Sequence, residues 1–282
     1  MESIAHTHEL GVCSWSRMID DPLECAATVT DSLGLRVVQL ALDPLVDHPE
    51  TSGRWLRAFR DRGFTIASGM MAPAGEDYTS IGSIRRTGGF RVEALWNGHL
   101  ERAKQLAELA HNAAIPLVTM HAGSFVDDKG ELCCEIVDRI RTIALVFRDA
   151  DIEVAFETGH EPAHAVLALL DALAVEGVGV NFDPANMLLY GSGDPIEALS
   201  ELLPYVYQCH IKDAIPSERR ELWGTEVVVG TGRVDWLRFF GCLRRSQRPI
   251  GLMVEREAGD QRVDDIRSAI RFVHTHVPER AR

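Results

Sequence analysis

Residues 152–183 read IEVAFETGHEPAHAVLALLDALAVEGVGVNFD, and this stretch indicates the fold. It begins with a short apolar run at 152–157 and ends with another at 178–183. Nearly continuous apolar runs of this length are typical of parallel strands that are buried on both faces, and a helical pattern lies between them. The stretch is therefore expected to form one strand–helix–strand unit of an α/β protein.

The same unit recurs along the whole chain. Eight apolar runs of strand length lie at 10–14, 36–41, 64–69, 116–121, 152–157, 178–183, 206–211 and 249–255. Helical patterns such as 100–110 separate them, and Asp194–Pro195 and Asp235 are helix-start signals. No strand is followed by a GxGxxG motif, which disfavours a dinucleotide-binding sheet. Eight units predict an α/β protein with one (β/α)8 TIM-barrel domain over residues 1–282.

Composition and charge narrow the classes of function. The formal charge of -13 disfavours nucleic acid as a partner, because phosphate contacts require clustered Lys and Arg, and the sequence has no such cluster. The six cysteines show no CxxC motif, which fits a reducing compartment. Neither an export signal nor an apolar run of about 20 residues is present. We therefore expect a cytoplasmic protein that binds neither nucleic acid nor a membrane.

Two connections between the predicted strands and helices are unusually long. They span 70–97, which contains Gly75-Glu-Asp-Tyr78, and 213–233, which contains Trp223. Both should lie at the C-terminal face of the barrel, where barrel enzymes carry their active sites. A long connection at this face is often a lid, and 70–97 is the candidate for one.

The last four predicted strands each end with a residue that can bind a metal ion. These residues are Glu157, Asp183, His210 and Glu255. A barrel brings four successive strand ends together at its rim. Three carboxylates and an imidazole would repel one another and lose solvation there unless a cation lay between them. The spacing therefore predicts a site for one divalent metal ion.

The types of ligand indicate which ion is expected. Carboxylates with one imidazole favour Mn²⁺ or Mg²⁺, with Co²⁺ or Zn²⁺ as alternatives, and the absence of thiolates argues against a structural zinc site. A single carboxylate at a strand end is often a helix cap or a solvated residue instead. A purely structural ion is a further alternative, although the C-terminal rim of a barrel favours catalysis.

Five motifs in a fixed order carry a family resemblance. They are ETG at 157–159, NFDPANM at 181–187, HIKD at 210–213, VGTG at 229–232 with VDW at 234–236, and EREAG at 255–259. With them, nearly the whole chain resembles the xylose isomerase-like TIM barrels, the sugar phosphate isomerase/epimerase family. The resemblance implies one divalent metal on the four residues named above. It also implies that Glu157 and Glu255 form the acid/base pair, with proton transfer through a metal-bound enediolate.

The sequence also departs from its relatives. Ketose epimerases of this family usually carry a histidine three residues after the metal-binding aspartate, where this chain has Asn186. Their substrate arginine has no clear counterpart, since Arg219 and Arg220 are near but unaligned. The endonuclease branch uses a histidine-rich multi-zinc site, and too few histidines lie at strand ends here to match it.

Further residues are candidates for substrate binding, each with a structural alternative. His121 ends the fourth strand and either binds substrate or is a buried structural histidine. His160 either meets a sugar hydroxyl or caps the next helix. Lys212 has the same strand parity as His210, so it points either to a substrate anion or to a rim carboxylate such as Glu257. Asn186 and Glu257 complete this group of substrate-binding candidates.

Aromatic and thiol side chains are the remaining candidates. Trp15 and Trp223 would form apolar walls against a sugar face, or would be packing residues under loops. Cys13 and Cys209 lack an obvious base partner and are expected in the core, with Cys209 facing away from the site.

The leading hypothesis is an enzyme of carbohydrate metabolism, a metal-dependent isomerase or epimerase of a small sugar or sugar derivative. The alternative enzyme is a lyase or dehydratase acting on a keto-sugar or keto-glycoside, since both reactions begin with the same proton abstraction. A non-catalytic sugar-binding barrel and an endonuclease-type member are weaker alternatives. Members of the family are often oligomeric, so a homo-oligomer is a further expectation from the resemblance.

Overall fold

The computed structural model describes residues 8–276 except 18, 20, 128 and 220, and it confirms the predicted TIM barrel. Eight parallel strands close in the order β1-β10-β7-β6-β5-β4-β3-β2. They are β1 (Leu10–Cys13), β2 (Val37–Ala41), β3 (Thr65–Met71), β4 (Leu117–Met120), β5 (Glu153–Glu157), β6 (Val178–Phe182), β7 (Val206–Ile211) and β10 (Gly251–Val254). Every predicted strand is present. The ends of the predicted domain, 1–7 and 277–282, lie outside the described residues.

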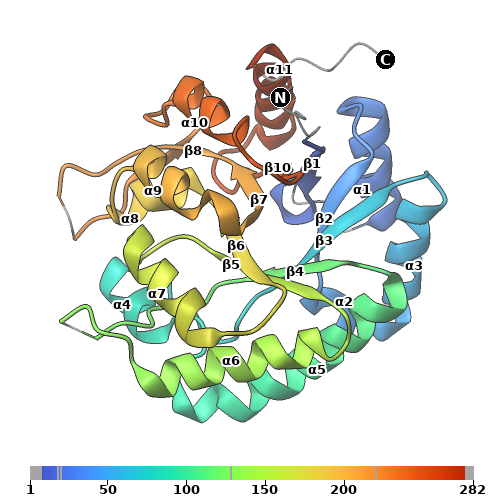
Figure 1. The fold of residues 1–282 in the computed structure, drawn as a ribbon. Helices are drawn as coiled ribbons and strands as arrows, with labels where there is room; N and C mark the ends of the chain where they lie inside the picture. Colours follow the sequence, from blue (N-terminus) through green and yellow to red (C-terminus); the bar gives the residue numbers. More distant parts are fainter. Residues whose placement is uncertain (1–7, 18, 20, 128, 220, 277–282) are drawn as a thin grey trace.

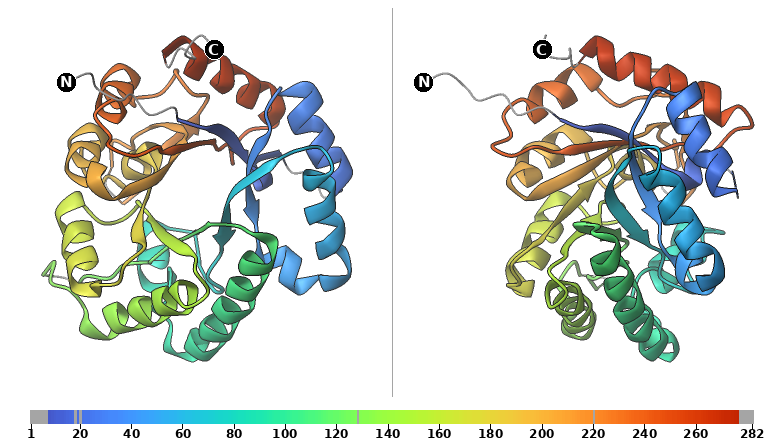
Figure 2. Two further views of the ribbon diagram at one scale, coloured as in Figure 1. Left: turned by 45° about the vertical axis from the view of Figure 1, so that its right-hand side comes forward. Right: turned by 90° about the vertical axis from the view of Figure 1, so that its right-hand side faces the viewer.

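Helices surround the barrel, as Figures 1 and 2 show. The helices that follow the barrel strands include α1 (Pro22–Ala27), α2 (Asp43–Asp47), α3 (Pro49–Arg60), α5 (Trp96–Ala113), α6 (Cys134–Arg148), α7 (Ala163–Leu173), α9 (Pro195–Leu202), α10 (Trp236–Leu243) and α11 (Arg262–His276). Both predicted caps are confirmed. Asp194 accepts hydrogen bonds from the first turn of α9, and Asp235 accepts one from the first turn of α10.

The main core lies between the strands and this outer layer of helices. Helix α6 illustrates why the pattern folds this way, because Ile136, Ile140, Ile143 and Phe147 recur at helical spacing and are all less than 5% exposed. Its other face carries charged residues. Burial of these apolar side chains against the strands fixes the helix on the barrel and so fixes the strand ends that carry the site.

The two long connections meet at the C-terminal face of the barrel. The first, 70–97, contains the helix α4 (Ile81–Thr87) and the short 3-10 helix η3 (Glu93–Leu95). The second, 213–233, folds into an antiparallel pair, β8 (Asp213–Ile215) with β9 (Thr225–Val227). The ring centroids of Tyr78 and Trp223 lie 6.5 Å apart, so the two connections approach each other. A lid function for 70–97 stays a prediction.

All six cysteines lie in the described part of the chain and are free. Cys209 packs in the hydrophobic core, as predicted, and burial raises the pKa of the Cys13 thiol to about 12. Over the described residues, no helix is both long and apolar enough to cross a membrane.

Candidate metal centre

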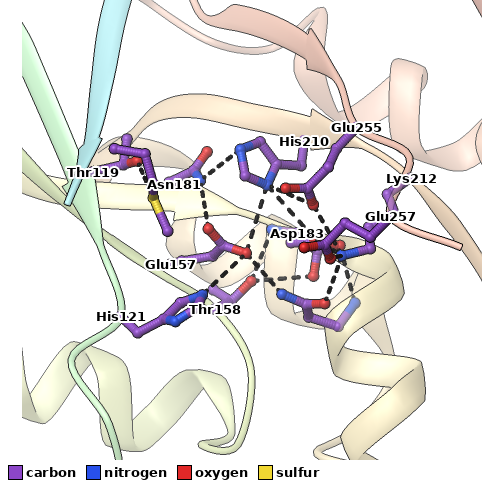
Figure 3. A network of polar contacts seen from close by, with 12 residues as sticks. Thr119, His121, Glu157, Thr158, Asn181, Asp183, His210, Lys212, Glu255 and Glu257 are labelled. Atoms are coloured by element: carbon purple, nitrogen blue, oxygen red, sulfur yellow. Dashed lines mark hydrogen bonds and ion pairs between the residues drawn. The ribbon is translucent and has the colours of Figure 1, made fainter. Parts of the chain in front are cut away.

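The barrel brings the four predicted ligands together. Glu157 ends β5 and His210 lies in β7, while Asp183 and Glu255 directly follow β6 and β10. One ligand atom from each lies within 4.8 Å of the others. The Nδ1 atom of His210 is 3.5 Å from Glu157 Oε1, 3.7 Å from Asp183 Oδ2 and 3.3 Å from Glu255 Oε2. Figure 3 shows these side chains pointing toward one another.

Two atoms of this cluster lack the partners that buried polar groups need. The four side chains are at most 4% exposed. Within the part of the chain that the structure describes, neither Asp183 Oδ2 nor His210 Nδ1 has a hydrogen-bond partner. Leaving such groups buried and unbonded costs free energy. A divalent cation would satisfy both, and ligands rich in carboxylate oxygen suit Mn²⁺ or Mg²⁺.

The charges of the cluster also indicate a binding site for a divalent cation. Burial alone lowers the pKa of His210, but the carboxylates of Glu255 and Glu157 outweigh it and raise the pKa well above its usual value. For Asp183, burial raises the pKa of the carboxyl group, with Lys212 opposing. Without a metal, these carboxylates therefore favour a second proton on the His210 ring, which a divalent ion would displace.

Asp183 serves as a helix cap as well as a candidate ligand. Its Oδ1 accepts hydrogen bonds from the backbone N–H groups of Ala185, at 2.8 Å, and Asn186, at 2.9 Å, at the start of α8 (Pro184–Tyr190). Its Oδ2 points into the cluster. The helix-cap alternative for a strand-end carboxylate is thus correct for this residue, and it leaves the other oxygen available for a metal.

Lys212 points inward, but carboxylates already surround it. Its Nζ lies 2.9 Å from Glu255 Oε2 and 2.6 Å from Glu257 Oε2, and the residue is only 3% exposed. Asn186 links Lys212 to Glu157, because its Oδ1 accepts a hydrogen bond from Lys212 at 3.3 Å and its Nδ2 donates one to Glu157 Oε1 at 2.7 Å. The rim-carboxylate alternative for Lys212 is therefore confirmed, because Glu257 pairs with it, and a contact with a substrate anion stays a prediction.

His121 is held by residues of the 70–97 connection. Its Nδ1 lies 3.1 Å from Glu76 Oε2 and 2.9 Å from the Tyr78 hydroxyl. Its Nε2 lies 3.8 Å from Glu157 Oε1. Burial lowers the pKa of His121, but Glu76 and Glu157 outweigh it and raise the pKa well above its usual value. Sequence reasoning missed Glu76, because nothing in the spacing connects it to the fourth strand.

His160 and Tyr190 line the pocket next to Glu157, and Trp223 packs against Tyr190 from outside the pocket lining. The ring centroids of His160 and Tyr190 lie 4.2 Å apart, and those of Tyr190 and Trp223 lie 4.8 Å apart. Tyr190, which the sequence did not single out, lines the pocket with His121, Glu157 and Asn186. His160 also lines it, and burial lowers the pKa of its imidazole to about 4.

The structure changes the interpretation of two candidate residues, His160 and Trp15. His160 does not cap helix α7, whose N-cap residue is Pro162 with no side-chain cap. Trp15 is more than an apolar wall, since its indole Nε1 donates to Glu255 Oε1 at 2.8 Å. Its ring also meets that of His210 edge-on, with centroids 6.3 Å apart. Arg219 is exposed, and Arg220 lies outside the described residues.

The remaining motif residues build the fold beside the site. The Asp213 carboxylate accepts hydrogen bonds from the backbone of Gly230, Gly232 and Val234, at 2.9, 3.1 and 3.2 Å, and from the indole of Trp236, at 2.9 Å. A Cβ atom on Gly232 would lie 2.1 Å from Asp213 Oδ1, so only glycine fits. HIKD, VGTG and VDW are therefore one structural unit that folds the 213–233 connection back onto β7.

Comparisons with known proteins agree with the fold. The family described as xylose isomerase-like TIM barrel matches residues 28–276. A xylose isomerase domain protein from Planctomyces limnophilus is 27% identical over 95% of each chain, with a TM-score of 0.79. No curated protein sequence matches significantly.

Two more distant structures share the fold. A probable 3-DHS dehydratase from Bacillus anthracis is 16% identical and covers 98% of this chain and 100% of its own, with a TM-score of 0.71. A D-psicose 3-epimerase from Clostridium cellulolyticum H10, solved with D-tagatose, is 13% identical and covers 95% of this chain and 99% of its own, with a TM-score of 0.70. Proteins described as an epimerase and as a dehydratase thus share this fold.

Proposed function

Because the chain belongs to the xylose isomerase-like TIM barrel family, we propose that it is a divalent-metal-dependent isomerase or epimerase of a small sugar or sugar derivative. The observation that supports this most strongly is the buried four-ligand cluster with two unpartnered ligand atoms, found within the described residues at the catalytic face of the barrel. A divalent cation there would polarise a substrate carbonyl and its neighbouring hydroxyl, which makes the adjacent C–H acidic.

Glu157 and Glu255 are suited to move the proton. They come from β5 and β10, which β6 and β7 separate in the barrel, so they approach the centre from different sides. Burial raises the pKa of Glu255, but His210 and Lys212 outweigh it and lower the pKa to about 2. Burial also raises the pKa of Glu157, but His210 and His121 outweigh it and hold the pKa well below its usual value.

Two ionised carboxylates on different sides of a substrate can share one reaction. One takes the proton from carbon and the other returns a proton, either to the opposite face of the same carbon or to its neighbour. The first outcome is epimerisation and the second is isomerisation. Asn186 and Asn181 orient Glu157 by donating to its two oxygens, and Trp15 orients Glu255.

The charges around the centre favour an uncharged substrate. Glu76 and Glu257 add to the three ligand carboxylates. Among the described residues that line the pocket or contact the cluster, Lys212 is the one lysine or arginine, and Glu255 and Glu257 already neutralise it. A phosphate group would therefore meet net negative charge. The ring of Tyr190, which lines the pocket and is supported by Trp223, suits the apolar face of a neutral sugar ring.

One observation favours a lyase as the second candidate. His121 lies beside Glu157 and is held by Glu76, so the pocket contains a third group that can transfer a proton. Elimination needs such a group, because the departing hydroxyl or glycosyl oxygen must be protonated while the carbon acid loses its proton. Epimerisation needs only the two glutamates.

The test is mass-resolved turnover in D₂O with Mn²⁺, using ketoses, keto-glycosides, inososes and the corresponding phosphates. Wild type is compared with Glu255→Gln, and with Glu153→Gln as a matched control at the start of β5, the opposite end of the strand from Glu157. A Mn²⁺-dependent product that keeps its formula, gains deuterium and disappears only with Glu255→Gln supports the proposal. A product that has lost water or an aglycone assigns the lyase, and turnover that is independent of metal overturns both.

A further inference from the structure

A layer of buried amide side chains lies directly under the metal centre, inside the barrel. It consists of Gln39 on β2, Asn181 on β6 and Gln208 on β7, all at most 1% exposed. The interior of such barrels is usually filled by branched apolar residues. Amides in this place must be hydrogen-bonded, and their bonds determine which atom each amide presents to its neighbours.

The orientation of the first amide follows from Glu157. A carboxylate can only accept hydrogen bonds at neutral pH, and Asn181 Nδ2 lies 3.1 Å from Glu157 Oε2. Asn181 therefore turns its nitrogen toward Glu157 and its oxygen away. That oxygen, Oδ1, accepts from Gln208 Nε2 at 3.2 Å.

The orientation of Gln208 in turn determines the orientation of Gln39. Because Gln208 presents its nitrogen, its second contact at 3.0 Å must be with an acceptor, which is Gln39 Oε1. The other end of Gln39 agrees, since its Nε2 donates to Thr119 Oγ1 at 2.7 Å. Gln39 Oε1 also faces Nε2 of His210, at 2.9 Å. An amide oxygen only accepts, so His210 must carry a proton on Nε2.

We propose that Gln39 is a positioning residue that fixes the tautomer of His210 for metal binding, an inference that rests on the metal site of the proposed function. With the proton held on Nε2, the lone pair of the neutral ring lies on Nδ1. Nδ1 is the atom that faces the three ligand carboxylates. Asn181 Nδ2 lies 3.1 Å from His210 Nε2, and since both atoms then carry hydrogen, this contact is not a hydrogen bond.

The amides therefore connect two metal ligands through the floor of the barrel. The chain runs from Glu157 through Asn181, Gln208 and Gln39 to His210. Partners of this kind, which hold the second nitrogen of a ligand histidine, typically change metal affinity by about 10- to 100-fold when they are removed. Gln39 lies 171 residues from His210 in the sequence, so only the closed barrel reveals the pair.

Two substitutions of Gln39 separate positioning from packing. Gln39→Met keeps the length of the side chain but removes the acceptor, and we expect it to weaken Mn²⁺ binding by about 10- to 100-fold. Gln39→Glu keeps an acceptor facing His210, and we expect it to retain affinity close to wild type. A role in packing alone predicts the reverse order, because a buried carboxylate is harder to accommodate than a thioether. Ser68→Ala is the control, since Ser68 bonds Gln208 but not His210.

Mn²⁺ affinity is measured by calorimetry, and the tautomer by long-range ¹H–¹⁵N NMR of histidine-labelled protein with Mg²⁺. Equal affinity of wild type and Gln39→Met, or a proton on Nδ1 in the wild type, overturns the inference. If Gln39→Met does not fold, the affinity of Gln39→Glu and the wild-type tautomer decide. If the wild type binds no divalent ion, the proposed function fails instead. The tautomer of His210, measured above its raised pKa where the ring is neutral, then still tests the role of Gln39.

Discussion

Replacing Asp183 by Asn and by Ala should separate its two roles. Asn keeps an oxygen that can accept from the N–H groups of Ala185 and Asn186, so the α8 cap survives, whereas Ala loses it at a cost of about 1 kcal/mol. Asn also removes the charge of a carboxyl whose pKa burial raises. The metal-free Asp183→Asn protein should therefore be at least as stable as wild type, and Asp183→Ala less stable.

Mn²⁺ should stabilise the wild type against unfolding much more than it stabilises Asp183→Asn. At a Mn²⁺ concentration of about 100 Kd, binding stabilises wild type by about 2.7 kcal/mol. For a chain of 282 residues that is a rise in Tm of about 5 °C. Loss of one of four ligands should weaken binding about 100-fold, so the same Mn²⁺ concentration would equal the new Kd. The stabilisation then falls to about 0.4 kcal/mol, a shift of about 1 °C.

Thermal unfolding of the three proteins, each with EDTA and with Mn²⁺, measures both effects, and calorimetry checks the Kd. An Asp183→Asn protein whose Tm still rises like wild type would show that Oδ2 is not a ligand. A metal-free Asp183→Asn protein as unstable as Asp183→Ala would show that the cap was not retained. Either result would refute the assignment of one oxygen to each role.

Three further predictions concern other residues around the centre. Asp213→Ala should destabilise the protein by about 3 kcal/mol or more in urea unfolding, because the loop and the Trp236 indole lose their acceptor, and a loss below about 1 kcal/mol would contradict this. His160 should stay neutral in NMR titrations down to about pH 5, because its pKa is about 4. Since the unfolded imidazole takes up a proton first, near its usual value of about 6.5, His160 should lower stability by up to about 3 kcal/mol as the pH falls from about 6.5 to about 4, an effect absent in His160→Gln. Lys212→Met should tighten Mn²⁺ binding about tenfold, because it removes a cation 2.9 Å from a ligand carboxylate, and calorimetry showing weaker binding would reject this.

The barrel was predictable because its signal is local and repeated. Each strand, such as 152–157 or 178–183, is a short apolar run that must be buried on both faces, and each helix between them has one apolar side. The sequence analysis predicted no elements within the two long connections, where 70–97 contains α4 and η3 and 213–233 contains the pair β8 and β9. Their residues pack against distant parts of the chain, which local patterns do not record.

The candidate ligands could be identified from the sequence alone, because one ligand-type residue ends each of the last four predicted strands and a barrel must bring those ends together. How these residues are held depends on contacts between distant parts of the chain. Trp15 reaches Glu255 across 240 residues, Glu76 reaches His121 across 45, and Gln39 reaches His210 across 171. Hydrogen bonds depend on the direction and separation of two particular atoms. Periodicity specifies which face a residue lies on, but only the closed barrel sets which atoms meet.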